Sequence, residues 1–173
     1  DILDHAKLQD HQLQVEITNC SITHLITETI DMFAFKSDEK KIQLHSNIAA
    51  DVPHWLLLDY RKTKQILINL LGNAIKFTQQ GSIQVSVSLT RHKARNMLDL
   101  CVSDTGPGIA EADQAQLFEA FAQTELGRNN QQGTGLGLTI CVELAQLMSG
   151  RMHVDSQPGV GSNFHCLLPC EVE

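Results

Sequence analysis

The sequence predicts a two-layer α/β sandwich of the α+β class, in which a mixed, mostly antiparallel sheet packs against helices. Helix-like and strand-like segments follow one another without strict alternation, which indicates this architecture. Residues 60–77 place apolar side chains at helical spacing, whereas residues 82–90 and 163–168 alternate as strands do. The chain has 173 residues, 42% of them hydrophobic, which is enough for one domain with a substantial core.

The first elements are indicated by their caps and periodicity. Residues 1–13 place apolar side chains at helical spacing with no N-cap signal before them, so we expect them to be the end of a longer helix. Residues 14–18 alternate like a short strand. Ser21 is a favourable N-cap, and apolar residues at helical spacing follow it. The expected elements are therefore strand 14–18, helix 21–36, strand 42–48 and strand 55–58.

The second half begins with the long helix 60–77, which ends before Gly81. Two strands around a polar turn then predict a hairpin, and a second hairpin closes the chain around a turn at 158–161. A polar, glycine-rich stretch to Gly137 separates the two hairpins. The expected elements are helix 60–77, strand 82–90, strand 97–103, helix 113–121, helix 138–148, strand 152–155 and strand 163–168.

Composition excludes several classes of function. A net charge of −7 and a pI near 5.5 argue against a nucleic-acid-binding surface. The five cysteines are odd in number and lie mostly in apolar runs, which favours reduced thiols and a cytoplasmic location. His165 with Cys166 and Cys170 is a conceivable metal site, but alternation there favours a plain strand. No apolar run reaches the ~18 residues of a membrane span, so any anchor would lie outside these residues.

The long helix carries three polar residues on one face. Asn69, Asn73 and Lys76 fall within about 60° of one another at helical spacing, while Leu70 and Leu71 point the other way. Two carboxamide oxygens and an ammonium suit Mg²⁺ that is held by few protein ligands together with phosphate oxygens. An ordinary solvated helix face explains the same pattern equally well.

Two glycine-rich segments follow. Asp104-Thr105-Gly106-Pro107-Gly108-Ile109 comes at the end of an apolar strand, where the carboxylate can accept from an amine and the glycines permit close approach. A surface turn has a similar composition. Gly133-Thr134-Gly135-Leu136-Gly137-Leu138 opens a helix, whose N–H groups suit phosphate. It lacks the lysine of a Walker loop, and no strand precedes it, so a dinucleotide fingerprint does not fit either.

These three signals in this order resemble the catalytic domain of sensor histidine kinases, from the ATPase superfamily shared with Hsp90, MutL and type II topoisomerases. Residues 59–78 match the family's N box, and residues 104–109 and 133–138 its two glycine boxes. Phe118-Glu119-Ala120-Phe121 resembles the F box, and residues 158–164 the closing motif. The resemblance covers residues 14–173 and implies a Bergerat-type ATP-binding fold. Residues 1–13 resemble the end of the dimerisation helix, so the expected division is 1–13 and 14–173.

The resemblance implies ATP and Mg²⁺ as cofactors under a lid at about 121–132. Asn73 would ligate Mg²⁺ with support from Asn69, and Lys76 would contact phosphate. Asp104 would bond the adenine amino group. The residues expected to act in transfer are Asn69, Lys76, Arg128 and Gln132. The residues expected to hold the nucleotide are Asn73, Lys76, Asp104, Gly106, Gly108, Ile109, Phe121, Gly133, Thr134, Gly135, Leu136, Gly137 and Ser162.

Some positions depart from the family's pattern. The family often has Arg where Lys62 stands, Thr where Asn163 stands and Gly where Gln132 stands. Arg128 lies one residue further from Gly133 than the common spacing of the lid arginine. The role of that arginine can therefore belong to Gln132 instead.

The implied function is transfer of the γ-phosphoryl group of ATP to a histidine of a dimerisation domain. None of the eight histidines here is followed by an acidic residue as the phosphoacceptor is. Implied partners are that dimerisation domain and a response regulator or receiver domain. The parent would be a homodimer, and the resemblance extends to hybrid kinases and to sensors anchored in the inner membrane. No nucleic acid is expected as a partner. An ATP-hydrolysing clamp is a second hypothesis, disfavoured because Asn69 replaces the clamp's glutamate. A catalytically silent nucleotide-sensing or partner-binding module is a third.

Overall fold

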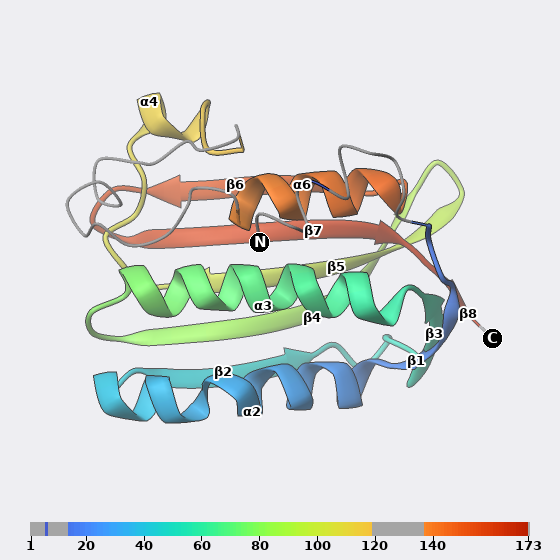
Figure 1. Cartoon of the computed structure of the whole chain (residues 1–173), viewed down its shortest axis with the longest axis horizontal. Coiled ribbons are helices and arrows are strands. Elements are labelled where there is room, and N and C mark those ends of the chain that lie inside the picture. The colour runs from blue at the N-terminus through green and yellow to red at the C-terminus, as the bar shows by residue number, and fades with distance from the viewer. Residues whose placement is uncertain (1–5, 7–13, 119–136, 173) are drawn as a thin grey trace.

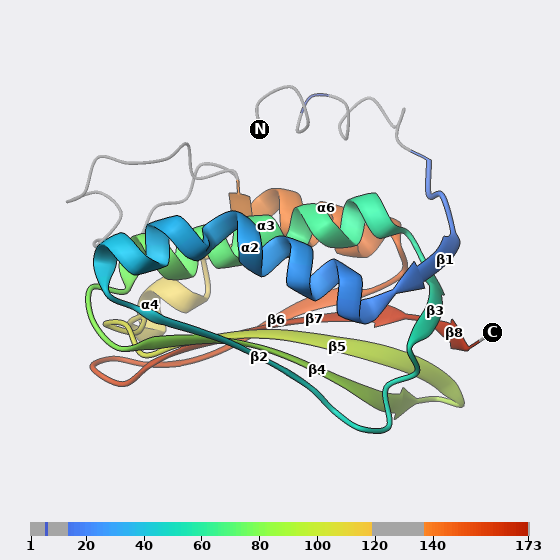
Figure 2. The ribbon, with the colours of Figure 1, turned by 90° about the horizontal axis from the view of Figure 1, so that it is seen from below.

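A computed structural model of the chain describes residues 6, 14–118 and 137–172. Within them, helices α2, α3 and α6 lie side by side in one layer and cover one face of a sheet (Figure 1). Figure 2 shows the two layers from the side, which confirms the predicted sandwich. The helices and strands, in chain order, are β1 (Thr18–Ser21), α2 (Ile22–Lys40), β2 (Gln43–Ile48), β3 (Trp55–Leu58), α3 (Tyr60–Phe77), β4 (Ser82–His92), β5 (Arg95–Asp104), α4 (Glu111–Gln114), α6 (Gly137–Leu147), β6 (Arg151–Gln157), β7 (Gly161–Pro169) and β8 (Glu171–Val172).

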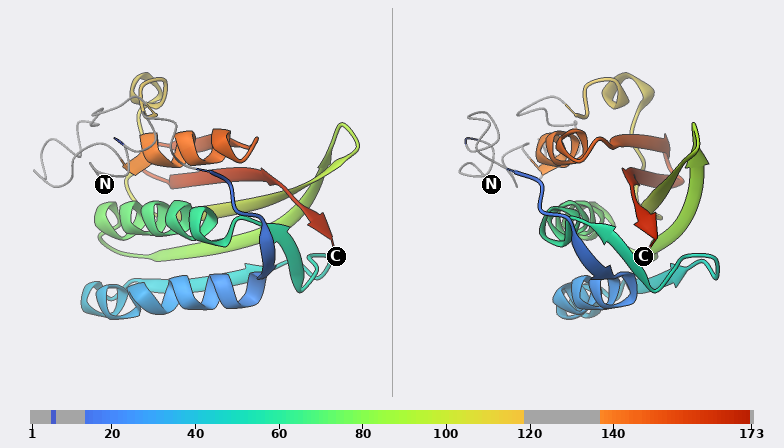
Figure 3. Two further views of the ribbon diagram at one scale, coloured as in Figure 1. Left: turned by 45° about the vertical axis from the view of Figure 1, so that its right-hand side comes forward. Right: turned by 90° about the vertical axis from the view of Figure 1, so that its right-hand side faces the viewer.

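The main sheet has the strand order β2-β4-β5-β7-β6. Its neighbouring strands are antiparallel except β2 and β4, which run parallel, so the predicted mixed and mostly antiparallel sheet is confirmed. Both predicted hairpins are present, as β4–β5 and β6–β7. A second, smaller sheet of order β1-β3-β8 lies at one end of the helix layer, beside the C-terminus (Figure 3).

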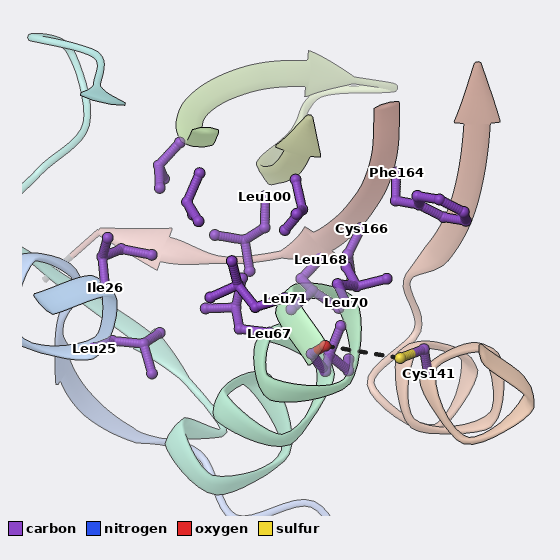
Figure 4. Packing of buried hydrophobic residues seen from close by; sticks show 14 of the residues in the cluster. Leu25, Ile26, Leu67, Leu70, Leu71, Leu100, Cys141, Phe164, Cys166 and Leu168 are labelled. Carbon is purple, nitrogen blue, oxygen red and sulfur yellow. Dashed lines mark hydrogen bonds between the residues drawn. The ribbon is translucent and has the colours of Figure 1, made fainter. Parts of the chain in front are cut away.

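The core lies between the helices and the main sheet. Leu67, Leu70 and Leu71 of α3 are almost inaccessible to solvent, and they face Leu100 and Cys166 of the sheet (Figure 4). Transfer of such side chains from water stabilises the fold by about 1.5–3 kcal/mol each. The Cys141 thiol of α6 lies 3.8 Å from the main-chain oxygen of Ile66, so α6 packs directly against α3 (Figure 4).

Both long helices begin directly after a side-chain N-cap, of which Ser21 was predicted and Asp59 was not. The Ser21 hydroxyl accepts from the His24 N–H, and the Asp59 carboxylate accepts from the Lys62 N–H. Helix α3 spans the predicted residues, 60–77. Helix α2 continues four residues beyond the predicted end, because its C-cap is Lys41, whose φ of 55° lies in the left-handed region and ends the helix.

Other predicted boundaries shift. The first strand covers 18–21 instead of 14–18, because residues 18–21 pair with β3. Helix α4 covers 111–114 instead of 113–121, of which residues 119–121 lie outside the described part of the chain. Strand β8 was not predicted.

The predicted strand around His165 is confirmed. Cys166 belongs to the core, whereas His165 points to the opposite face of the sheet, where its Nδ1 lies 3.0 Å from the Asp99 carboxylate. All five cysteines are buried free thiols. None of the described helices is both long and apolar enough to cross a membrane.

Candidate functional site

The polar face of α3 is built as the sequence predicts. Asn69, Asn73 and Lys76 are half-buried, while Leu70 and Ala74 between them face the core. The three side chains therefore lie along one side of a helix whose opposite side is fixed by packing. Burial lowers the pKa of Lys76, whose ammonium lies 4.9 Å from the centre of the Phe77 ring.

Asn69 connects α3 to the start of α6. Its Nδ2 donates to the main-chain oxygen of Gly137 over 3.3 Å, and its Oδ1 accepts from Gln65 Nε2 over 3.1 Å. The last glycine of the second glycine box is thereby brought to the N box. These hydrogen bonds fix the Asn69 side chain and leave one lone pair of its Oδ1 for a further ligand.

Asp104 ends β5 with its carboxylate half-buried. Its Oδ1 accepts from the Gly106 N–H over 2.8 Å. Burial raises the pKa of Asp104 above its ordinary value, and the N–H groups of Gly106 and Ser162 oppose that rise. A partly desolvated carboxylate held by main-chain donors is a strong acceptor for a ligand amine.

The first glycine box lies against the end of α3. A Cβ atom at Gly106 would lie 2.8 Å from the Asp104 Oδ1 and 3.2 Å from the Thr78 Oγ1, so a larger residue would be crowded there. The Thr78 hydroxyl is buried and has no hydrogen-bond partner within the described residues. An unsatisfied buried hydroxyl beside Asp104 fits a bound ligand or a ligand-bridging water. Sequence reasoning missed Thr78, because only its position in space beside Asp104 marks it.

The closing motif packs on the same loop. The Gly159 N–H donates to the Pro107 oxygen over 2.7 Å, and the Ile109 N–H donates to the Ser156 hydroxyl over 2.8 Å. The Ser156 and Ser162 hydroxyls lie 2.8 Å apart. Gly108 has a φ of 71°, and a Cβ there would overlap the main-chain oxygen of Gln157. Gly108, Ile109 and Ser162, three of the residues expected to hold the nucleotide, are therefore brought together.

An open polar cavity of about 590 Å³ lies next to this loop. Gln84, Ser103 and Asn163 line it, and they stand opposite one another across β4, β5 and β7. Since Ile83 and Val85 on either side of Gln84 face the core, this cavity opens on the sheet face away from the helices. Asp104 and Ser162 also line this cavity, which therefore reaches the first glycine box and the closing motif.

Several predicted site residues lie outside the described part of the chain, as does the predicted lid at 121–132. They are Phe121, Arg128, Gln132, Gly133, Thr134, Gly135 and Leu136. The described residues contain no group of three or more His, Cys, Asp or Glu side chains that could hold a metal ion. The donors on the polar face of α3 are carboxamides, which suit Mg²⁺ with phosphate oxygens as its other ligands. The residues present therefore fit this ion.

Comparisons with known proteins identify the family of the chain. Residues 58–172 match the family described as "Histidine kinase-, DNA gyrase B-, and HSP90-like ATPase". The signal transduction histidine-protein kinase BarA of Escherichia coli K12 is 38% identical over 168 residues, which are 95% of this chain and 18% of BarA. The chain therefore spans less than a fifth of that relative.

Solved structures give the same result. Full-length ShkA in complex with AMPPNP has a TM-score of 0.87 at 29% identity and covers 99% of this chain, which spans 35% of ShkA. The catalytic domain of histidine kinase ThkA has a TM-score of 0.73 at 27% identity and covers 89% of this chain, which spans 97% of it. With the family matched over most of its length, the chain belongs to the histidine kinase-, DNA gyrase B- and HSP90-like ATPases.

Proposed function

We propose that this chain binds ATP with Mg²⁺ and donates the γ-phosphoryl group to a histidine on a separate dimerisation domain, as the catalytic domain of a two-component sensor kinase. The observation that carries the proposal is the Asp104 carboxylate and the unsatisfied Thr78 hydroxyl, which meet at Gly106, together with the polar face of the helix that Thr78 ends. A carboxylate acceptor at one end and carboxamides with an ammonium along the helix match the two ends of a nucleotide.

Asp104 would accept a hydrogen bond from the adenine amino group, because its half-buried carboxylate is held in place by the main-chain N–H groups of Gly106 and Ser162. Gly106 and Gly108 would let the purine lie directly on the main chain. Thr78 would complete the adenine end, either by direct contact or through a bridging water. Ser162 would support Asp104 through the main-chain bond that lowers the carboxyl pKa.

Asn73 would present a carboxamide oxygen to Mg²⁺, with Asn69 as its support. Bound Mg²⁺ would bridge phosphate oxygens and offset the charge that develops during transfer. Lys76 would contact phosphate, because a phosphate anion forms charge-assisted hydrogen bonds with a partly desolvated ammonium. We propose that Gly133, Gly135 and Gly137 hold phosphate oxygens and that Arg128 or Gln132 acts from the lid.

The proposed partners follow from the relatives. BarA is named a signal transduction histidine-protein kinase, and this chain matches less than a fifth of it. We propose that the parent of this chain is a homodimeric sensor kinase. We further propose that this domain lies in the cytoplasm and that the phosphoryl group passes on to a receiver domain.

Nucleotide titration calorimetry tests binding. ATP and ADP are expected to bind more tightly with Mg²⁺ than without it, and Asp104→Asn should weaken ATP by tenfold or more, because the amide replaces an acceptor with a donor. A loss of about 1.5–3 kcal/mol is typical for a charge-assisted hydrogen bond. Unchanged affinity would contradict the role of Asp104.

The metal site has its own variant. Asn73→Ala should abolish the Mg²⁺ dependence of binding without unfolding α3, because Ala is the better helix former. Asn47→Ala, at an exposed position of β2, is the matched control and should bind like wild type. Persistent Mg²⁺ dependence in Asn73→Ala, together with a sharp fall in melting temperature, would make Asn73 a structural residue.

A further inference from the structure

The Asp59 carboxylate is buried and has more partners than a helix cap requires. Only 2% of Asp59 is exposed. Its Oδ1 accepts from the Lys62 N–H over 3.0 Å, which is the ordinary N-cap bond of α3. Its Oδ2 accepts from the Lys62 ammonium and from the Glu16 N–H, each over 2.8 Å. The second oxygen is therefore engaged beyond the cap bond, by the Lys62 side chain and by the main chain of Glu16.

The Lys62 ammonium extends the same connection. Besides its ion pair with Asp59, it donates to the main-chain oxygen of Gln14 over 2.6 Å, and only 12% of the Lys62 side chain is exposed. Residues 14–17 belong to no strand or helix. Their course is therefore set by these two contacts with α3 and by the adjoining strand β1, which pairs with β3.

The charge state of the pair makes the two residues depend on each other. Burial alone would raise the pKa of Asp59, but the Lys62 side chain and the Lys62 and Glu16 N–H groups together lower it below its ordinary value. The carboxylate is thus ionised at neutral pH. Removal of the ammonium would leave a buried charge with main-chain donors only.

The same helix leads directly to the nucleotide. Asn69 follows Lys62 by seven residues, about two turns of α3. The segment that enters the domain is therefore fastened to the rigid element that carries the metal and phosphate contacts. A misplacement of about 1 Å between reacting groups can slow a reaction about a hundredfold.

We propose that Asp59 and Lys62 are positioning residues for phosphoryl transfer, because they fix the entering segment 14–17 to the nucleotide-binding helix and so set the direction in which bound ATP faces the acceptor histidine. The inference rests on the proposed function. We call this arrangement the linker clamp: Asp59, Lys62 and the main chain of residues 14–16.

The first test is amide hydrogen exchange on the 173-residue chain with Lys62→Met and Lys62→Arg. The Glu16 N–H should exchange at least tenfold faster in Lys62→Met, because Asp59 then loses its partner and the Gln14 contact disappears. Lys62→Arg should restore protection. Arg61→Ala, an exposed basic neighbour in the same turn, is the matched control and should leave exchange unchanged. Equal exchange in wild type and Lys62→Met would overturn the linker clamp.

The second test compares phosphoryl transfer in two arrangements, with the acceptor domain joined through residues 1–13 and with it supplied as a separate protein. Lys62→Met should slow the joined reaction at least tenfold, while the reaction between separate proteins and the Kd for ATP stay within twofold of wild type. Lys62→Arg should restore the joined rate. An equal loss in both arrangements, or none, would overturn the positioning role. If wild type labels the acceptor in neither arrangement, the proposed function fails, and Glu16 exchange still decides whether the linker clamp exists.

Discussion

The side-chain amide of Asn69 donates a hydrogen bond to the main-chain oxygen of Gly137, 68 positions further along the chain. This one bond joins the N-box helix to the first turn of α6, where the last glycine of the second glycine box stands. The two motifs are thereby held together in the described part of the chain without any ligand.

Asn69→Ala should loosen this junction. Two hydrogen bonds are lost, each worth about 0.5–1.5 kcal/mol, and part of the loss is offset because Ala is the better helix former. We expect the free energy of unfolding to fall by about 1 kcal/mol in urea denaturation. Gln65→Ala removes only the second of these bonds and is the control. A larger loss in Gln65→Ala than in Asn69→Ala would show that Gly137 contributes nothing.

Asp104 gives stability a specific pH dependence. Burial raises its pKa, so the folded state takes up a proton at higher pH than the unfolded state does. Protonation of Asp104 therefore stabilises the folded state relative to the unfolded state as pH falls through the folded pKa. This stabilisation is lost as pH rises. The melting temperature of wild type relative to Asp104→Asn should rise as pH falls from about 7 to about 4.

Affinity for ATP should move in the opposite sense, because a protonated Asp104 has lost acceptor capacity. Acidification should weaken ATP binding to wild type at a higher pH than an ordinary aspartate would allow, and should weaken binding to Asp104→Asn much less. Parallel pH profiles for the two proteins in both melting and binding would contradict the role given to this carboxyl.

Tyr60 is the single tyrosine of the chain, so its ionisation can be followed alone by absorbance near 295 nm. Burial, and then the hydrogen bond that its hydroxyl donates to Glu28, raise the pKa of Tyr60 to about 12. The folded state keeps this proton above pH 10, the ordinary value, so the contribution to stability is complete below pH 10 and is lost as pH rises toward 12.

Glu28→Gln should lower the pKa of Tyr60 toward 10, because the negative charge beside the hydroxyl disappears. The effect of burial remains, so the value should fall only part of the way. Asp31→Asn, at an exposed position of the same helix, is the control and should titrate like wild type. An ordinary titration of Tyr60 in folded wild type would show that α2 and α3 do not meet at this pair.

Lys40 closes the other end of the N-box helix. Its ammonium donates to the main-chain oxygens of Ile75, Lys76 and Thr78, which the end of α3 leaves without helical partners. Lys40→Met should therefore lower the free energy of unfolding by about 1.5–3 kcal/mol, as for hydrogen bonds to charged groups. Lys36→Met, exposed on the same helix, should change it by less than about 0.5 kcal/mol. Equal stabilities of the two variants would refute the capping role.

Local signals explain which elements were predictable. Helix α3 was predicted to its observed ends, because apolar residues recur at helical spacing over 60–77 and Gly81 follows them. Strand β8 and the parallel pairing of β2 with β4 depend on partners far away in the chain, such as Leu57 opposite Glu171. No local pattern encodes such pairings, so neither was predicted.

The candidate site divides in the same way. Asn73, Asp104 and Gly106 were proposed from residue type and spacing within one motif, and their roles in the site stay predictions. Thr78 and Lys40 were missed, since their roles come from contacts across elements: Thr78 lies beside the first glycine box, and Lys40 reaches α3 from α2. The contacts of Asp59 with residues 14–16 were missed for the same reason.

The central claim is tested most directly by incubation of this chain with γ-labelled ATP, Mg²⁺ and a separately supplied dimerisation domain. The account predicts acid-labile phosphate on the acceptor histidine of that domain and none on the 173-residue chain. The reaction should be slow and need high protein concentration, because the tether that raises effective concentration is missing. It should be lost in Asn73→Ala. Label on the isolated chain, or an unlabelled acceptor while ATP is demonstrably bound, would contradict the account, and the second result would favour a silent nucleotide-binding module.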